Sequence, residues 1–191
     1  MREITFKIEE KQDGLMIRDF LRNFGVSSAL LTKLKQDENG ISLNGEFAKA
    51  MAVLHTSDVL KIRIKNKGKM PEKFVCDKVR VAYDDEDILV LNKPPLMPVH
   101  ESRNHRGDTL ANVAACYMES DCAFRAVYRL DRDTSGLVLI AKNELAASKL
   151  AGKIKKDYYA IVKGKFEGEG TIDLPIRRVR ESIIERGVFD D

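Results

Sequence analysis

The sequence predicts an α+β fold in two parts, a small N-terminal α/β module and a larger mixed domain. Apolar residues recur near helical spacing between residues 15 and 35, and segments on either side alternate as strands do. The chain changes character near residue 70, where basic residues are mixed with Asn, Gly and Pro. This stretch is typical of a flexible linker, so we expect a module at residues 1–66, a linker at 67–78 and a second domain at 79–191.

The N-terminal module is expected to contain two short helices, a hairpin and a strand. The helices are predicted at Leu15–Phe24 and Ser28–Lys35, because the apolar residues of each segment gather on one face. Asn44–Gly45 is a strong hairpin signal, since both turn positions need a positive φ that Asn and Gly tolerate. Val59–Ile64 alternates strictly, so one face of this strand should be apolar and the other basic.

The second domain is expected to alternate strands with helices. Its acidic segment Asp84–Asp87 suggests a cation site, but it lacks Gly where a calcium loop requires one, so a solvated hairpin turn is the favoured interpretation. We expect strands at Val79–Tyr83, Ile88–Asn92, Leu137–Lys142 and Tyr158–Lys163, and helices from Thr109 to about Glu119 and from Asn143 to Ile154.

Composition sets modest bounds on function. The net charge of +3 is too small to establish a nucleic-acid partner. The distribution is more informative, because the basic residues from Lys61 to Lys73 are interrupted by one acid, Glu72, and such a run suits phosphate. The same run fits a flexible linker, and both interpretations can hold. Taken alone, a basic strand face is more typical of solvated surface.

The cysteines and the apolar segments bear on the compartment. Cys76, Cys116 and Cys122 are an odd number without the paired spacing of metal ligands, which favours reduced cytosolic thiols over disulfides or zinc. No apolar stretch is long enough for a membrane span, and residues 1–10 alternate like a strand, unlike a signal peptide. We therefore expect a cytoplasmic protein.

The run Tyr128–Leu137 places Asp131 between two arginines, Arg129 and Arg132. Nearby positive charge favours the ionised form of a carboxylate, and an ionised Asp can act as a nucleophile or a base. The alternative is a structural Asp in a surface turn, paired with one of the arginines. From physical chemistry alone the structural interpretation is favoured, because such ion pairs are often structural.

This run resembles the signature of the RluA-type pseudouridine synthases, in which R-L-D-x-x-T-S-G-L carries the catalytic aspartate. Three further segments resemble that family in the same order. Ile88–Pro95 resembles its strand and N-K-P turn, followed here by His100, and Lys155–Gly164 resembles its K-x-x-Y-x-A-x-V-x-G segment. The two predicted N-terminal helices and Gly40–Glu46 resemble the αL RNA-binding motif of a ribosomal small-subunit protein.

The resemblance implies an RNA pseudouridine synthase with a mixed, mostly antiparallel sheet and flanking helices, acting on ribosomal or transfer RNA without a metal or cofactor. We also expect a monomer. It implies that Asp131 is the catalytic residue and that Tyr158 matches the active-site tyrosine. Arg129 would help to hold the target nucleotide out of its stack, because a guanidinium plane stacks on bases. The residues expected to bind RNA are Arg129, Lys33, Lys35, Lys61, Arg63, Lys65, Lys67, Lys93 and His100.

The sequence departs from the family after Pro175–Arg178. Family members continue into strands with an R-T-H-Q-I-R motif that completes the central sheet, and residues 179–191 do not carry this motif. We therefore expect an incomplete, C-terminally truncated synthase domain. The alternative function is a catalytically inactive RNA-binding protein that uses the N-terminal module.

Overall fold

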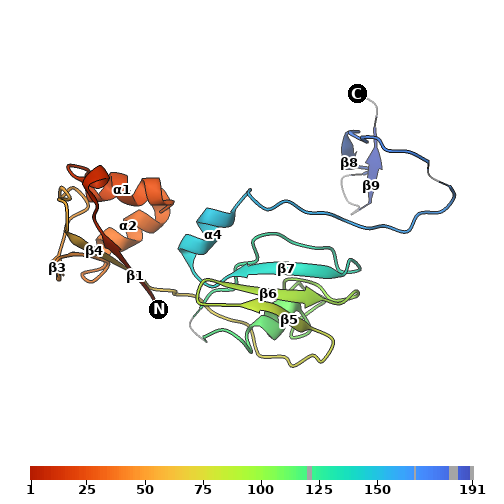
Figure 1. The fold of residues 1–191 in the computed structure, drawn as a ribbon. Helices are drawn as coiled ribbons and strands as arrows, with labels where there is room; N and C mark the ends of the chain where they lie inside the picture. The colour runs from red at the N-terminus through yellow and green to blue at the C-terminus, as the bar shows by residue number, and fades with distance from the viewer. Residues whose placement is uncertain (120–121, 166, 181–184, 190–191) are drawn as a thin grey trace. The chain divides into compact units, whose positions relative to one another are not determined.

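The structure is a computed structural model that describes residues 1–119, 122–165, 167–180 and 185–189. It divides into two compact units, Met1–Lys155 and Lys156–Asp191. The fold is mixed α+β with antiparallel sheets, as the sequence predicted (Figure 1). In the part of the chain that the structure describes, no helix has the length and apolar character needed to cross a membrane.

A four-stranded antiparallel sheet forms the base of the N-terminal region, in the order β1-β4-β2-β3. Its strands are β1 (Arg2–Lys7), β2 (Ile41–Leu43), β3 (Glu46–Phe47) and β4 (Val59–Ile64). The alternation predicted for β4 is confirmed, because alternate side chains along it are fully buried: Leu60, Ile62 and Ile64. The hairpin between β2 and β3 is also confirmed, with φ of 53° at Asn44 and 90° at Gly45.

Two helices pack on this sheet, α1 (Ile17–Phe24) and α2 (Ser28–Gln36), after a short 3-10 turn η1 (Glu10–Gln12). Both match the predicted segments to within two residues. The apolar stripe of each is buried, including Leu21 of α1 and Leu34 of α2. The first hydrophobic core therefore lies between these helices and the sheet.

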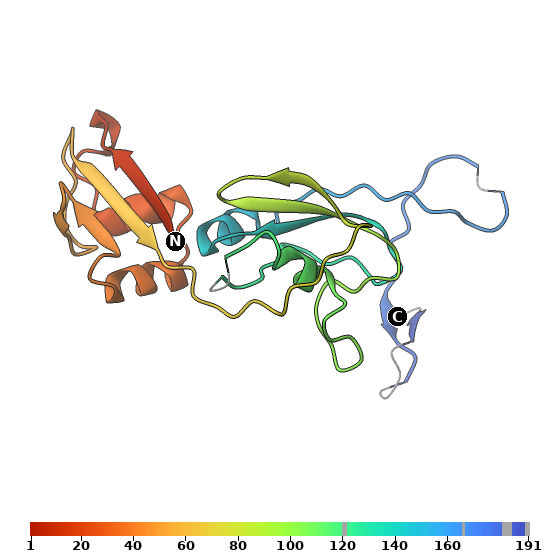
Figure 2. The ribbon, with the colours of Figure 1, turned by 90° about the horizontal axis from the view of Figure 1, so that it is seen from below.

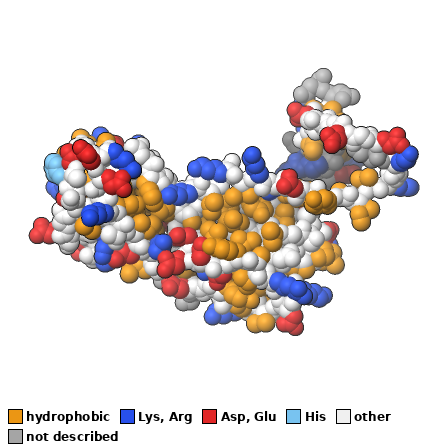
Figure 3. All heavy atoms as spheres, in the orientation of Figure 1, with side chains coloured by type: hydrophobic (Ala, Val, Ile, Leu, Met, Phe, Trp, Pro, Cys, Tyr) orange, Lys and Arg blue, Asp and Glu red, His pale blue; other side chains and the backbone are white. Residues whose placement is uncertain are grey.

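A second hydrophobic core lies against a three-stranded antiparallel sheet, ordered β5-β6-β7 (Figure 2). Its strands are β5 (Arg80–Asp84), β6 (Ile88–Lys93) and β7 (Gly136–Ala141), and they confirm three of the predicted strands. Hydrophobic side chains also gather on the outer face over β6 and β7 (Figure 3), where Leu137 is 53% exposed. Within the predicted linker at 67–78, Met70 is buried in the second core and Cys76 packs against it. One compact unit contains both cores, and the predicted domain limits stay a prediction.

Two helices accompany the second sheet, α3 (Leu110–Ala114) and α4 (Glu144–Leu150). The prediction that the first would extend to about Glu119 is wrong. After Ala114 the amides of Cys116 and Tyr117 bond to carbonyls three residues back, so the chain continues in tight turns. The second helix is capped as predicted by Asn143, whose side chain accepts from the Ala146 amide, but it ends at Leu150 instead of Ile154.

The acidic segment forms a hairpin turn, as favoured from the sequence. The Asp85 carboxylate accepts hydrogen bonds from the amides of Asp87 at 2.8 Å and Ile88 at 2.7 Å. These bonds from the Ile88 and Asp87 amides lower the pKa of Asp85. The carboxylate therefore closes the connection between β5 and β6.

The second unit contains a short hairpin of β8 (Ile176–Arg178) and β9 (Arg186–Val188). The strand predicted at Tyr158–Lys163 is wrong, because this segment has no regular structure and Ile161 is fully exposed. A strand is stable when a neighbour satisfies its backbone groups, and among the described residues none pairs with this segment.

Candidate active site

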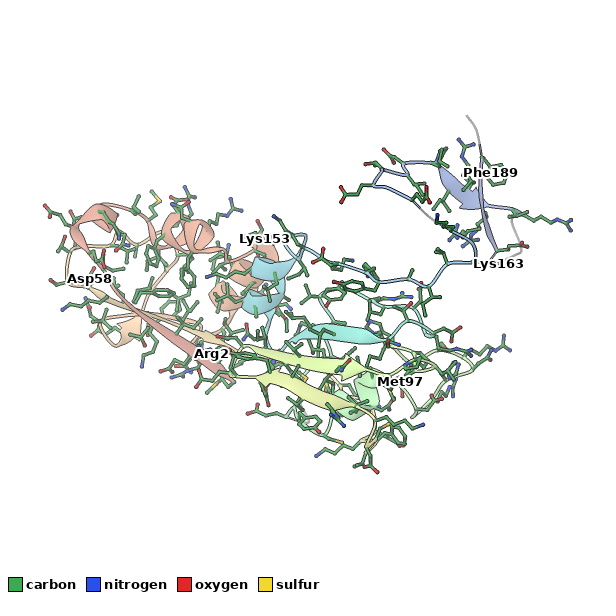
Figure 4. All side chains as sticks on the ribbon, turned by 45° about the vertical axis from the view of Figure 1, so that its right-hand side comes forward. Arg2, Asp58, Met97, Lys153, Lys163 and Phe189 are labelled. Carbon is green, nitrogen blue, oxygen red and sulfur yellow. The ribbon has the colours of Figure 1, made fainter. Side chains whose placement is uncertain are left out.

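Two loops leave the same end of the β5–β7 sheet. β6 and β7 are antiparallel, with Lys93 directly opposite Gly136. The loop after β6 therefore starts, and the loop before β7 ends, at this end of the sheet. Met97, just beyond the end of β6, marks the first loop (Figure 4), which also carries His100. The second loop carries Asp131. The sheet therefore brings together two sequence motifs that lie far apart in the chain.

Lys93 ties the two loops to each other. Its side chain is fully buried at the end of β6. The ammonium donates hydrogen bonds to the carbonyls of Pro94 at 3.1 Å and Met97 at 2.8 Å in its own loop. It donates a third, of 3.0 Å, to the carbonyl of Arg132, the residue after Asp131. A buried charge thus fixes the backbone beside the candidate catalytic residue.

The electrostatic surroundings of Lys93 connect it to the same loop. Burial lowers the pKa of its ammonium, and the negative charges of Asp133 and Asp131 oppose that shift. A side chain without solvent contact offers no surface to a phosphate, so in this structure Lys93 is not placed to bind RNA as expected. The alternation of β6 was the available signal, because it puts Lys93 on the same buried face as Leu89 and Leu91.

Asp131 itself is exposed on a loop with a buried anchor. Leu130, the preceding residue, is 8% exposed and belongs to the second core. The Asp131 carbonyl accepts from the Thr134 amide at 3.2 Å, which closes the turn. Arg132 pairs with Asp133 at 2.8 Å, and across the described residues Asp131 forms no ion pair with either flanking arginine. The geometry therefore does not favour the structural ion-pair alternative.

His100 is exposed and has Phe124 and Arg129 as neighbours. Its ring lies edge-on to Phe124, with 5.1 Å between centroids. Burial, and then the positive charge of Arg129, lower the pKa of His100, which favours the neutral imidazole. Arg129 and His100, two residues expected to bind RNA, are thus brought near each other. Phe124 was missed from the sequence, because it lies outside every recognisable motif.

Tyr158 lies in the second compact unit, outside the unit that carries Asp131. It is 59% exposed. Its assignment as the partner of Asp131 therefore stays a prediction.

The remaining RNA-binding candidates belong to the N-terminal region. Four cations line a groove of about 620 Å³, which we call the basic groove: Lys33, Arg63, Lys65 and Lys67. Lys61 and Arg63 also pair with Glu3 across β1 and β4, at 2.8 and 3.0 Å. Lys35 is exposed on α2. Asp131 does not line the basic groove, so the two candidate sites are separate.

Comparison with known proteins identifies the family. The model of the RNA pseudouridylate synthase family matches residues 87–190, more than half of the chain and the whole segment that forms the two loops. The chain belongs to the RNA pseudouridylate synthase family. Within this family it is similar to an uncharacterised RNA pseudouridine synthase, YjbO, of Bacillus subtilis, with 34% identity over 93% of this chain and 66% of that protein.

Two further pseudouridine synthases match a shorter segment. The ribosomal large subunit pseudouridine synthase D of Pseudomonas aeruginosa is 42% identical over 53% of this chain and 34% of its own length. The tRNA pseudouridine synthase C of Haemophilus ducreyi is 31% identical over 56% of this chain and 46% of its own length. The chain spans less than two thirds of the length of the curated synthases that it matches.

Proposed function

We propose that the protein carrying these residues isomerises uridine in RNA to pseudouridine, with Asp131 as the reacting carboxylate. The observation that carries the proposal is the position of Asp131, which is exposed on a loop whose backbone is fixed by the buried Lys93 ammonium. Membership of the family supports it. The related synthases are named for ribosomal or transfer RNA, and we propose one of these RNA classes as substrate.

The proposed reaction breaks one bond and forms another within the same nucleotide. Cleavage of the C–N glycosidic bond builds positive charge at the anomeric carbon, and the Asp131 carboxylate stabilises that charge or attacks the carbon. The freed uracil turns and rejoins the ribose through C5, and the C5 proton then leaves. Tyr158 is proposed to lie against the base, while Arg129 and His100 hold the extruded nucleotide.

RNA binding is proposed for the N-terminal module, which we infer to be of the αL type. Two helices followed by a hairpin support this inference, as does the grouping of cations in the basic groove. Lysine and arginine at such a surface contact phosphates, which position an RNA without reading its sequence. Lys35 and Lys61 are proposed to extend the same contact.

The second candidate function is RNA binding without catalysis by residues 1–191 alone. Two observations favour it: Tyr158–Lys163 forms no strand, and residues 179–191 lack the expected R-T-H-Q-I-R motif. The chain covers 66% of the length of the related synthase YjbO. Activity should therefore be assayed on the longest natural form of the protein that contains this sequence.

The experiment follows tritium release from C5-labelled uridine in RNA. Asp131→Asn should abolish release while fold and RNA affinity stay nearly unchanged, because the two side chains are close in size and shape. Asp133→Asn is the matched control, since it removes a carboxylate two residues away that pairs with Arg132 and should leave most activity intact. Substantial release by the Asp131→Asn protein would overturn the assignment.

The compartment and the oligomeric state are also proposals. Cys76, Cys116 and Cys122 are free thiols, which supports a reducing, cytoplasmic environment. We propose a monomer, and sedimentation equilibrium of the intact protein is the direct test.

A further inference from the structure

Carboxylates already form ion pairs with cations of the basic groove. Lys65 lies 2.6 Å from Asp37, which closely follows α2. Lys33 of α2 lies 2.6 Å from Glu144. Glu144 is the first residue of α4, so its carboxylate comes from the part of the chain that follows β7. The Lys33–Glu144 pair therefore joins the N-terminal region to the sheet that carries the candidate active site.

Glu144 is held in place by partly buried neighbours. Its side chain is 18% exposed and lies 3.4 Å from Arg125, which is equally buried. Arg125 donates a 2.6 Å hydrogen bond to the side chain of Asn66, in the segment after β4. The Asn66 amide in turn donates to the sulfur of Cys122 at 3.2 Å and to the carbonyl of Lys142. Lys33, in contrast, is 62% exposed and open to an incoming ligand.

Other contacts hold the same junction without using the groove. Ser148 of α4 donates a 2.9 Å hydrogen bond to the carbonyl of Gly25, and the Lys149 ammonium lies 3.4 Å from the ring centroid of Phe24. Arg2, at the start of β1 (Figure 4), also pairs with Asp87 at 3.0 Å. Loss of the Lys33–Glu144 pair would thus change the groove while these contacts keep the junction closed.

We propose that an RNA phosphate replaces Glu144 as the partner of Lys33, so that Glu144 is an internal competitor that weakens RNA binding in the basic groove. The inference rests on the proposed RNA-binding function of the N-terminal module. Carboxylate and phosphate oxygens accept charge-assisted hydrogen bonds from an ammonium at similar distances. After the exchange Glu144 keeps Arg125 as a partner, so its partly buried charge is not left alone.

The test compares the full chain with its Glu144→Gln variant in binding a fluorescein-labelled single-stranded RNA, followed by anisotropy. Gln keeps the size of the side chain and a hydrogen bond to Arg125, but not the charge that competes for Lys33. Affinity should increase about two- to fivefold at low salt, the range expected for an exposed ion pair. The gain should shrink as salt screens the pair.

Glu38→Gln is the matched control. Glu38 lines the same groove and is exposed, and within the described ranges it forms no ion pair with a cation. Its neutralisation changes the net charge equally but frees no lysine, so it should raise affinity clearly less than Glu144→Gln does. Glu144→Asp gives a second test, because it keeps the charge but withdraws it from Lys33 by one methylene. Its gain in affinity should be smaller than that of Glu144→Gln.

A double-mutant cycle separates competition from a structural role. Lys33→Ala should weaken RNA binding more in the Glu144→Gln background than in the unaltered chain, because Lys33 is then free for phosphate. Equal effects in both backgrounds, or equal affinity of the Glu144→Gln and Glu38→Gln proteins, would show the exchange to be wrong while RNA binding stands. If the unaltered chain binds no RNA at low salt, the proposed function fails and the exchange fails with it.

Discussion

Lys93 has no solvent contact, and its hydrogen-bond partners are three backbone carbonyls. Neutral carbonyls can hold a buried ammonium when several converge on it, because together they replace the hydration that burial removes. One of the three belongs to Arg132, so the bond reaches into the loop of the candidate catalytic residue. The candidate site thus depends on a single residue, Lys93, that does not itself face the substrate.

Lys93→Met tests this arrangement. Methionine fills similar space but donates no hydrogen bond, so buried carbonyls lose their donor and the free energy of unfolding should fall by about 1–3 kcal/mol. The proposed synthase activity, assayed on the longest natural form, should fall strongly, because the Asp131 loop loses its tether. RNA affinity and its salt dependence should stay unchanged. Urea unfolding, tritium release and RNA anisotropy measure the three quantities.

Lys78→Met is the control, since Lys78 is an exposed lysine before β5. It should leave stability and activity nearly unaltered. A shallower salt dependence of RNA binding in the Lys93→Met protein would contradict the proposed role, because it would indicate a lost phosphate contact.

At the scale of secondary-structure elements, the turn between β5 and β6 is held by a carboxylate that binds backbone amides, whereas Lys93 binds backbone carbonyls. The Asp85 side chain accepts from two amides of its own turn. Such bonds favour the ionised form, so the pKa of this carboxyl is lower in the folded chain than the ordinary value of 3.8. The ionised Asp85 therefore stabilises the fold at pH values above its ordinary pKa. This stabilisation is lost as the pH falls through the lower pKa that Asp85 has in the folded chain.

Asp85→Asn should therefore change how stability depends on pH. Near pH 7 the variant should be less stable by no more than about 1 kcal/mol, because the carboxylate is largely exposed. The difference should vanish as acid protonates Asp85 in the unaltered chain. Melting temperatures recorded from neutral pH to below 3.8 measure it, with Asp77→Asn in the preceding exposed segment as control. A difference that persists at the lowest pH would contradict the assignment.

The sequence predicted correctly those elements that depend on interactions between residues close in the chain. The two N-terminal helices, the Asn44–Gly45 turn and the alternation of β4 depend on residues close in sequence, and all are confirmed. The Tyr158–Lys163 strand failed because a strand needs a partner elsewhere in the chain. Its alternating apolar residues indicate strand propensity, but a strand also needs a second strand to which its backbone can hydrogen-bond.

At the scale of the whole molecule, the candidate site depends on pairing between strands far apart in sequence. The register that places Lys93 opposite Gly136 brings the two loops together. The hydrophobic periodicity of each strand does not reveal which residues of the two strands lie opposite one another. The flanking arginines drew attention to Asp131, and the resemblance gave Asp131 and His100 their expected roles. The tether by Lys93 and the contact of His100 with Phe124 required the three-dimensional structure.

Leu145 of α4 is a second long-range feature, because it packs in the first hydrophobic core although its helix follows β7. It is 5% exposed. Leu145→Ala should lower the free energy of unfolding by about 2–5 kcal/mol through the cavity that it leaves. Leu150→Ala, at a half-buried position on the same helix, should cost clearly less. Equal losses, measured by urea unfolding, would contradict the packing of Leu145 in that core.

The position of Leu145 also has a consequence for synthesis on the ribosome. The strands and helices of the N-terminal region are complete at Ile64, but the core that they enclose receives Leu145 much later. Chains usually fold from the N-terminus as they emerge. Here the nascent N-terminal region would keep an unfilled, solvent-accessible hole until α4 has left the ribosome, so its final packing waits for the segment that follows the candidate catalytic loop.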